Sequence, residues 1–342
     1  MRLLAAVVLL LLAAAPAHGV MVVGGKRVAV ASVPWFADIG GCGGTLVAPD
    51  RVVTAAHCVI GSTPERLERI RVAGETRRGV RFGLHPDWRN GNGRNLLDDV
   101  ALIQLDAPVT TVAPVALGGA SAERMTVLGR GASKSNHRGA GQLREAVLRP
   151  VTDRDCGLFY QRSRGNDGER FSAPRMLCAT DIDGRRPLSS ACVGDSGGPL
   201  YTGPKTAPVL LGIVSFGGDR CGADRLPSVF AEVANYAPFI TTAAPVWAPL
   251  ATGPSRVSGR PRVGGRLTCA VAGWEGAPER VSFTWLRASR GGRVRTAGRG
   301  ATYRVRRADV GRALVCVAEA TNAGGVASAP VEEESAVFVG RG

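Results

Sequence analysis

Three short stretches of the sequence carry residue types that could activate a serine. Residues 192–199 read Cys-Val-Gly-Asp-Ser-Gly-Gly-Pro, and glycines in such a loop let backbone N–H groups point inward together. His57 stands in the run Thr-Ala-Ala-His-Cys, and the acidic pair Asp98-Asp99 leads an apolar segment. A histidine can take the proton of a serine and return it to a leaving group, while an acid orients the histidine. These residues therefore predict nucleophilic catalysis by Ser196.

At these motifs the sequence resembles the chymotrypsin-like, or trypsin-fold, serine peptidases. The resemblance runs from about Val22 to Ile240 and is closest to the secreted trypsin-like enzymes of bacteria. It implies an all-β fold of two packed six-stranded antiparallel β-barrels with a C-terminal helix. It also implies a catalytic triad and an oxyanion hole made by two backbone N–H groups, so the expected residues are His57, Asp99 and Ser196 for the triad and Gly194 and Ser196 for the hole.

Asp98 and Asp99 compete for the role of the acid. The family places its acid immediately before an apolar-Ala-Leu segment, which selects Asp99. Strand alternation favours the same choice, because neighbouring side chains point to opposite faces and only one of them can face His57. Asp99 is then expected to be buried and to fix the histidine tautomer, and Asp98 to be a surface or loop residue.

The segment Val22-Val23-Gly24-Gly25 resembles the mature amino terminus of the family, which cleavage of a precursor exposes. A new α-ammonium at Val22 could pair with Asp195, whose burial without a partner would be costly. Residues 1–19 have the basic start, apolar run and small residues of a secretory signal peptide. Residues 20–21 are then a short propeptide, and we expect a secreted, extracellular protein without a membrane span.

Eight cysteines in an exported chain favour four disulfides over a metal site. Sequence alone leaves many pairings open. The resemblance implies three of them and leaves the last two cysteines for the C-terminal region: Cys42–Cys58, Cys156–Cys178, Cys192–Cys221 and Cys269–Cys316. No His or Cys spacing typical of a metal site occurs, and the mechanism requires no cofactor.

The substrate pocket departs from that of enzymes that cleave after Arg or Lys. Ser190, six residues before Ser196, occupies the position where those enzymes have an aspartate. A neutral hydroxyl cannot compensate a buried guanidinium, so we predict uncharged P1 residues of small or medium size. Asp219 or Asp224 in the adjoining loop could restore a preference for basic residues.

Three more residues are expected to shape the same pocket. Ser215 and Gly217 belong to the wall segment that pairs with an extended substrate, and Gly217 leaves the mouth of the pocket open. Ser228 replaces the glycine of a Pro-Gly-Val-aromatic run and should narrow the pocket.

The region after residue 243 is predicted to be separate. Residues 244–255 form a proline-punctuated linker between the peptidase domain at 22–243 and a module at 256–340. In that module Cys269, Trp285 and Cys316 stand between alternating strands and resemble an immunoglobulin-like β-sandwich. Its role could be spacing or stabilisation, or binding of a cell-surface glycan or protein.

The chain is strongly basic, with a formal net charge of +15. Residues 252–342 hold 15 Arg and 7 acidic residues, and no aromatic-interleaved basic strip or nucleic-acid-binding motif occurs. We therefore expect no nucleic-acid partner. A basic surface attracted to acidic cell-wall polymers or membranes is the alternative to one that is merely solvated.

The leading hypothesis is a secreted serine endopeptidase that hydrolyses protein or peptide substrates through an acyl-enzyme. One alternative is a catalytically silent binding protein on a peptidase scaffold. Such proteins usually replace the histidine, the serine or the activation terminus, all of which are present here. Another alternative is a surface-anchored protein whose immunoglobulin-like tail carries the main role.

Overall fold

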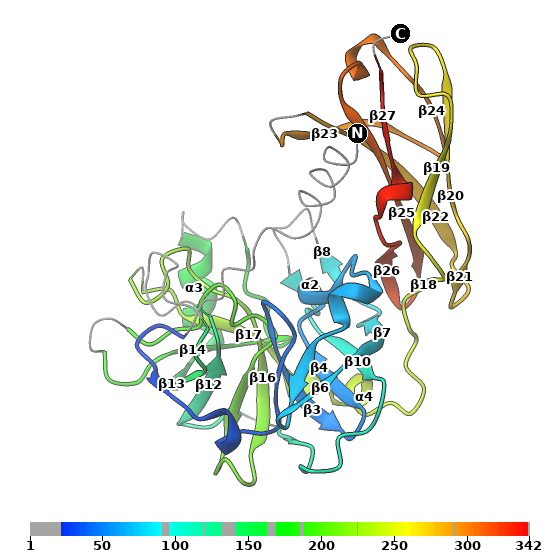
Figure 1. Ribbon diagram of the computed structural model, residues 1–342. Coiled ribbons are helices and arrows are strands. Elements are labelled where there is room, and N and C mark those ends of the chain that lie inside the picture. Colours follow the sequence, from blue (N-terminus) through cyan, green and yellow to red (C-terminus); the bar gives the residue numbers. More distant parts are fainter. Residues whose placement is uncertain are drawn as a thin grey trace. The chain divides into compact units, whose positions relative to one another are not determined.

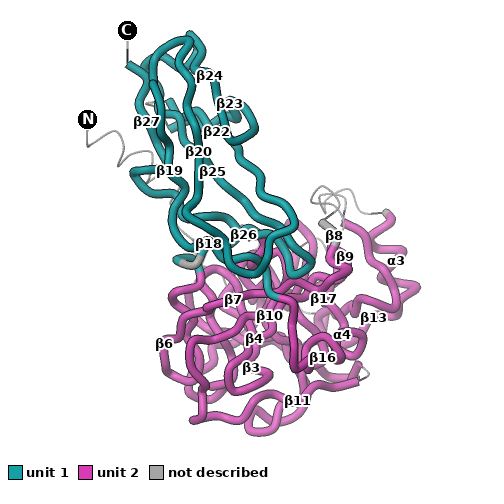
Figure 2. The backbone as a smooth tube through the Cα atoms, turned by 90° about the vertical axis from the view of Figure 1, so that its right-hand side faces the viewer, with its two compact units in different colours: residues 1–17, 61–66, 247–342 teal, residues 18–60, 67–246 magenta. Residues whose placement is uncertain are grey.

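The computed structural model describes residues 22–90, 96–119, 121–131, 141–162, 169–184, 188–223, 225–289 and 292–340. The predicted signal peptide and propeptide, and Asp224, lie outside these residues. The chain is mostly β (Figure 1). It forms two compact units, one with residues 67–246 and most of the chain before residue 61, the other with residues 247–342 and the short segment 61–66 (Figure 2).

Six antiparallel strands of the larger unit close into a barrel in the order β13-β12-β15-β16-β17-β14, because β13 pairs with β12 on one side and with β14 on the other. Met125, Val127 and Leu148 point into its core, as the alternation of the strands requires. The strands are β12 (Met125–Gly129), β13 (Arg144–Val151), β14 (Met176–Asp181), β15 (Pro199–Thr202), β16 (Val209–Phe216) and β17 (Ser228–Glu232).

The other sheet of this unit has seven strands and remains open. Its order is β6-β5-β2-β3-β4-β10-β7, and its two edge strands follow each other in the chain with only Arg78 between them. The strands are β2 (Phe36–Asp38), β3 (Gly43–Ala48), β4 (Arg51–Thr54), β5 (Ile70–Val72), β6 (Glu75–Arg77), β7 (Gly79–Leu84) and β10 (Ala101–Leu105).

The double-barrel architecture that the resemblance implies is therefore confirmed, but the prediction of two six-stranded barrels is wrong for the first. In that half the two edge strands, β6 and β7, are consecutive in the chain and only Arg78 separates them. A connection of one residue is too short for the two strands to turn and pair through hydrogen bonds, so the sheet stays open.

Short elements complete this unit. The helix α4 (Val233–Ile240) buries Val233, Tyr236 and Ile240, which confirms the predicted C-terminal helix. None of the helices in the described part of the chain is long and apolar enough to cross a membrane. The remaining elements are β1 (Lys26–Arg27), β8 (Arg89–Asn90), β9 (Leu96–Leu97), β11 (Ala116–Leu117), α2 (Ala56–Val59), α3 (Asp153–Arg162) and the 3₁₀ turn η1 (Val30–Ser32). The 3₁₀ turn η2 (Pro64–Leu67) falls mostly in the segment 61–66 of the other unit.

The second unit contains two main antiparallel sheets around a small core. The disulfide Cys269–Cys316 joins β20 of one sheet to β25 of the other, and Trp285 is fully buried and stacks on Tyr303. The three-stranded sheet consists of β19 (Ser255–Gly259), β20 (Arg266–Val271) and β24 (Thr302–Arg304). The five-stranded sheet consists of β22 (Arg280–Ala288), β23 (Val294–Arg299), β25 (Ala313–Asn322), β26 (Gly325–Ser328) and β27 (Ala336–Phe338). The pair β18 (Leu250–Ala251) and β21 (Trp274–Glu275), and the turns η3 (Arg307–Asp309) and η4 (Glu333–Ser335), complete the unit.

Candidate active site

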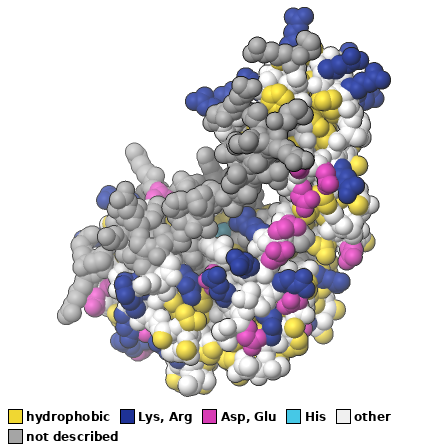
Figure 3. All heavy atoms as spheres, in the orientation of Figure 1, with side chains coloured by type: hydrophobic (Ala, Val, Ile, Leu, Met, Phe, Trp, Pro, Cys, Tyr) yellow, Lys and Arg dark blue, Asp and Glu magenta, His cyan; other side chains and the backbone are white. Residues whose placement is uncertain are grey.

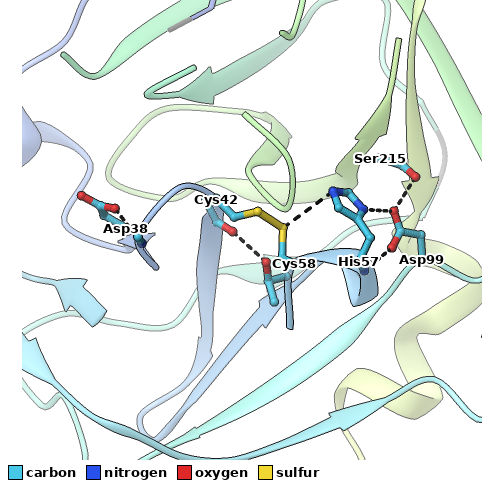
Figure 4. Close-up of a disulfide and its surroundings, with 9 residues drawn as sticks. Asp38, Cys42, His57, Cys58, Asp99 and Ser215 are labelled. Carbon is cyan, nitrogen blue, oxygen red and sulfur yellow. Dashed lines mark hydrogen bonds and ion pairs between the residues drawn. A yellow bond between two sulfur atoms is a disulfide. The ribbon is translucent and has the colours of Figure 1, made fainter. Parts of the chain in front are cut away.

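The position of His57 is fixed by the helix that contains it and by the disulfide of the next residue. It lies in the one-turn helix α2, shortly after β4, and its neighbour Cys58 is linked by a disulfide to Cys42, the residue before β3 (Figure 4). The side chain is 25% exposed. The imidazole is therefore fixed at its base and open to a reactant at its edge.

Asp99 and His57 form a tight pair. The Nδ1 atom of His57 lies 2.7 Å from Oδ2 of Asp99, and the backbone N–H of His57 donates to Oδ1 at 2.9 Å. The hydroxyl of Ser215, on β16, donates to Oδ2 at 2.6 Å (Figure 4). Asp99 is 1% exposed, so these donors replace water around its carboxylate. With Nδ1 facing the acid, Nε2 is the ring atom left for a substrate or nucleophile.

The environment raises the pKa of His57 above its ordinary value. Burial of the imidazole disfavours its charged form, but the negative charge of Asp99 and the hydrogen bond to it outweigh burial, and Glu169 adds to the effect. A raised pKa makes the ring a stronger base for the proton of a nucleophile.

We expect kcat/KM on a peptide substrate to rise with pH and to reach half of its plateau above pH 6.5, the ordinary pKa of histidine. Below this midpoint the ring is already protonated and cannot accept a proton. The measurement is a pH–rate profile on the chain that begins at Val22. A midpoint at or below 6.5 would contradict the assigned influence of Asp99.

The loop that bears Ser196 packs closely against the strand before His57. Gly197 has a φ of +75°, and a Cβ there would lie 2.1 Å from Oγ1 of Thr54, so this approach requires glycine. The N–H of Gly43 donates to the carbonyl of Ser196 at 2.8 Å. Ser196 is thus anchored beside the segment that carries His57. No hydrogen bond joins its hydroxyl to the imidazole in this part of the described chain, and such bonds are often long before substrate binds.

Three backbone N–H groups of residues 192–198 lack an acceptor among the described residues, and one of them belongs to the exposed Val193. The N–H groups of Asp195, Gly197 and Gly198 donate to the carbonyls of Cys192, Val214 and Asp195, respectively. Those of Gly194 and Ser196 donate to no acceptor among the residues that the structure describes. Gly194 has a φ of +91°, which side chains rarely adopt. The pair could stabilise an anionic oxygen next to Ser196.

Asp195 is completely buried behind this loop. Its carboxylate accepts the N–H of Gly131 at 2.5 Å and that of Cys192 at 2.8 Å. Burial raises the pKa of Asp195 well above its usual range, although the Cys192 hydrogen bond lowers it in part. No cationic side chain is among its contacts in the described chain. A buried carboxylate of this kind would be stabilised by a cation.

Val22 is fully buried in the core of the closed barrel, and Val23 forms a two-way backbone bridge with Ser190. Val23 also packs against the disulfide Cys192–Cys221. The amino-terminal segment therefore contributes to the same part of the barrel as the loop that bears Ser196. The remaining disulfide, Cys156–Cys178, joins α3 to β14. The structure has the three pairs that the resemblance implies and the fourth pair, Cys269–Cys316, that it leaves for the C-terminal region.

The serines predicted to line the pocket are internally hydrogen-bonded. The hydroxyl of Ser190 donates to the carbonyl of Ala191 at 2.7 Å, and the N–H of Ala191 donates to the hydroxyl of Ser228 at 3.0 Å. Both serines are buried. A Cβ added at Gly217 would meet nothing nearer than Cα of Ser228 at 4.0 Å, so there is open space in front of it. Asp219 is exposed.

Asp181 was not singled out from the sequence, yet it shapes the loop before the pocket. Its carboxylate accepts the N–H groups of Asp183, Gly184 and Ser189. Burial opposes its ionisation, but these donors outweigh burial and lower the pKa of Asp181. An isolated aspartate at the end of a strand gives no sequence signal of this role.

The expectation that Asp98 is a surface or loop residue holds in part: Asp98 lies in a turn, but it is buried. Asp98 is 3% exposed, and its carboxylate forms an ion pair with Arg175 and accepts the hydroxyl of Tyr236 at 3.2 Å. Its backbone has a φ of +56°, and its carbonyl accepts the N–H of Val100. The turn that presents Asp99 is therefore held by a buried carboxylate. Nothing local in the sequence connects this aspartate with an arginine 77 positions away.

We expect Arg175→Gln to lower the free energy of unfolding by about 1–2 kcal/mol, because it leaves the Asp98 carboxylate buried without its cation. The magnitude is moderate because the Arg175 side chain is 46% exposed. Denaturant unfolding would measure it, with Arg149→Gln as an exposed control. Adding Asp98→Asn to Arg175→Gln should recover part of the loss. If the double variant is less stable than the single one, the assigned ion pair does not account for the effect.

His57 also belongs to a group of three potential metal ligands, but this group does not suit a metal ion. Cys42, His57 and Cys58 have ligand atoms within 4.8 Å of one another. The two sulfur atoms are joined in a disulfide, so neither is a thiolate that could bind a cation. The Nε2 atom of His57 lies 3.8 Å from Sγ of Cys58.

Comparisons with known proteins agree with this geometry. The model of the Trypsin family matches residues 22–240. A trypsin of Saccharopolyspora erythraea is 32% identical over 210 residues, which cover 57% of this chain and 83% of that protein. A vitellin-degrading protease of Bombyx mori is 32% identical over 238 residues, covering 64% and 83%. Serine protease 56 of Homo sapiens is 35% identical over 243 residues, covering 64% and 38%.

The family match extends over more than half of the chain and includes every residue of the site described above. The chain belongs to the trypsin family of serine proteases. Membership in this family supports a hydrolase whose substrates are proteins or peptides.

Proposed function

We propose that this protein is a secreted serine endopeptidase in which His57, Asp99 and Ser196 form the catalytic triad. The observation that carries the proposal is the buried Asp99 carboxylate 2.7 Å from Nδ1 of His57, on the side of the ring away from Nε2. The unpaired N–H groups of Gly194 and Ser196 support an oxyanion hole beside the nucleophile.

In the proposed reaction, Oγ of Ser196 attacks the carbonyl carbon of the substrate while Nε2 of His57 takes the hydroxyl proton. Negative charge then moves to the carbonyl oxygen, where the N–H groups of Gly194 and Ser196 donate to it. His57 gives its proton to the leaving amine as the C–N bond breaks and the acyl-enzyme forms. Water, deprotonated by the same imidazole, releases the acid product and restores Ser196.

We further propose that cleavage before Val22 activates the enzyme. A free α-ammonium at Val22 would provide the cation that the buried Asp195 lacks, and Val22 and Val23 already pack beside the loop. We expect the chain that begins at Val22 to exceed its Nα-acetylated form in kcat/KM by about 100-fold or more, the factor expected when a buried ion pair loses one partner. Equal activity of the two forms would rule out this activation.

For specificity, we propose a preference for uncharged P1 residues, because the residues expected to line the pocket, Ser190 and Ser228, are neutral and their hydroxyls bond to neighbouring backbone groups. Initial rates would be measured on peptides that differ only at P1. We expect Ser190→Asp to raise kcat/KM for P1 Arg relative to P1 Ala by roughly 100-fold, since a buried carboxylate can pair with a guanidinium. Ser189→Asp is the matched control. Preferential cleavage after Arg or Lys by the unmodified enzyme would contradict the proposal.

We propose the domain order suggested by the sequence, with the peptidase domain at 22–243, a linker at 244–255 and an immunoglobulin-like β-sandwich at 256–340. The disulfide between two sheets and the buried Trp285 support the sandwich. Four disulfides support secretion, because such bonds persist in oxidising compartments. Kinship with secreted bacterial enzymes rests on the Saccharopolyspora relative, while animal relatives have similar identities.

A further inference from the structure

The arginines of the C-terminal unit gather at one end of its two sheets. We call this the basic end and define it by the described residues of the connections β19–β20, β22–β23 and β24–β25, with the strand residues beside them. The register places Gly259 opposite Leu267 in one sheet and Ala288 opposite both Val294 and Ala313 in the other. Asp309 bonds to Arg287 of one sheet and Tyr303 of the other, so these ends lie together.

The arginines at the basic end are exposed and lack acidic partners. Nine of them are exposed to solvent, and none of the nine forms an ion pair within the described residues: Arg260, Arg262, Arg266, Arg293, Arg295, Arg304, Arg306, Arg307 and Arg312. Asp309 is the single acidic residue at this end of the described unit, and it is completely buried against Arg287 and Tyr303. It therefore neutralises Arg287 and leaves the positive surface unbalanced.

The other acidic residues of this unit lie elsewhere. Glu65 is in η2, Glu275 is on β21, Glu279 precedes β22, Glu319 is on β25, and residues 332–334 are around η4. In Figure 3 dark blue side chains of this unit gather towards the end that carries the C-terminus in Figure 1, and its magenta side chains lie away from that end, with one dark blue group beside them. Clustered like charges repel one another in the free protein and attract a polyanion.

Two concave sites at the basic end are lined by arginine. The first has a volume of about 370 Å³ and is lined by Ser289 and four arginines, Arg287, Arg293, Arg295 and Arg312. The second has a volume of about 700 Å³ and is lined by Arg260, Arg262 and Arg266 with the glycine-rich turn between them. Arg287 is 16% exposed and its charge is offset by Asp309, so the three exposed arginines carry the unbalanced positive charge of the first site.

We propose that the basic end binds an acidic polysaccharide through the sulfate or carboxylate groups of successive sugars. The planar guanidinium donates two parallel N–H bonds to such oxyanions, which lysine cannot do in the same way. Two separate arginine-lined sites suit a polysaccharide, because its charged groups recur along the chain of sugars. This binding is independent of the peptidase site and would concentrate the enzyme on an acidic matrix.

The same surface is less suited to nucleic acid or to lipid. Single-stranded nucleic acid usually stacks on several exposed aromatic rings, whereas Trp285 and Tyr303 are buried in the core and Phe338 is the one exposed aromatic residue at this end of the described unit. Membrane-surface segments combine basic residues with a broad apolar face. The exposed large apolar residues at this end are Val263, Val294 and Phe338, which lie on three different connections or strands.

The test uses the full chain with Ser196→Ala, which prevents self-cleavage, and heparin oligosaccharides of defined length at about 0.15 M salt. Two variants each remove three exposed charges from one site: R293Q/R295Q/R312Q and R260Q/R262Q/R266Q. The matched control, R256Q/R280Q/R299Q, removes the same charge elsewhere in the unit. Thermal unfolding of each variant checks that the fold is intact, and the second triple variant replaces the first if the first unfolds.

We expect either basic-end variant to weaken heparin binding by about 10-fold or more and to reduce the slope of log Kd against log salt by about 2–3, as for the loss of three ionic contacts. The control should change Kd by less than about 3-fold, because its arginines lie outside the basic end. Equal losses in the control and the basic-end variants would overturn the proposal. So would absence of heparin binding, or tighter binding of a 20-base-pair DNA duplex or of phosphatidylglycerol vesicles.

Discussion

Ser196→Ala, introduced into the chain that begins at Val22, is expected to lower kcat on a peptide substrate by about 10⁴- to 10⁶-fold. The variant removes the only atom that can form the acyl-enzyme in the proposed reaction. Binding should persist, because the N–H groups of Gly194 and Ser196 belong to the backbone and remain in place. The substrate KM should therefore change much less than kcat.

The matched control for this variant is Ser32→Ala, which removes an exposed hydroxyl that donates to the nearby carbonyl of Ala29. Its kcat should equal that of the parent enzyme. Residual activity of Ser196→Ala above about 1% of the parent value would contradict a role for Ser196 as nucleophile, given the size of the effect when a nucleophile is lost.

Asp99→Asn is expected to reduce kcat by about 10⁴-fold at neutral pH while the fold persists. The neutral amide can donate towards Nδ1 of His57, which favours the tautomer with its proton on Nε2. That ring cannot take the proton of Ser196. Loss of the carboxylate also removes the charge that raises the pKa of His57, so the midpoint of the pH–rate profile should shift downward.

A control for lost charge is Asp106→Asn, whose carboxylate accepts hydrogen bonds from Arg78 at the barrel surface. It should keep the parent kcat and the parent midpoint. An Asp99→Asn enzyme with both values unchanged would show that the observed ion pair has no part in catalysis. Ser215→Ala should have a smaller effect than Asp99→Asn, because two contacts between His57 and Asp99 remain.

The sequence predicts the elements of the fold that a local pattern of residues determines. Val233, Tyr236 and Ile240 form the buried face of α4, as their spacing requires. The count of strands in the first half of the double barrel could not be predicted, because it depends on whether β6 and β7 meet through hydrogen bonds or through the single residue Arg78. Whether a sheet closes into a barrel depends on the three-dimensional path of the chain, which local sequence patterns do not show.

The site is predicted less completely than the fold. Strand alternation and the family motif select Asp99 over Asp98, and Asp99 is the residue that contacts His57. The same argument makes Asp98 a surface or loop residue, and it is in fact a turn residue that is buried. The side chain of Asp98 faces away from His57 and contacts Arg175 and Tyr236. Both partners are far from Asp98 in the sequence, so no local pattern reveals these contacts. Ser215 was assigned to the pocket wall, but its hydroxyl points to Asp99.

The central claim is that His57 and Asp99 activate Ser196, and covalent labelling tests it most directly. The chain beginning at Val22 would be treated with a fluorophosphonate, which phosphonylates an activated serine, and analysed by intact mass and peptide mapping. We predict one adduct per molecule, on Ser196, and none in His57→Ala or after denaturation. An unlabelled folded protein, or an adduct on another residue that survives His57→Ala, would contradict the account.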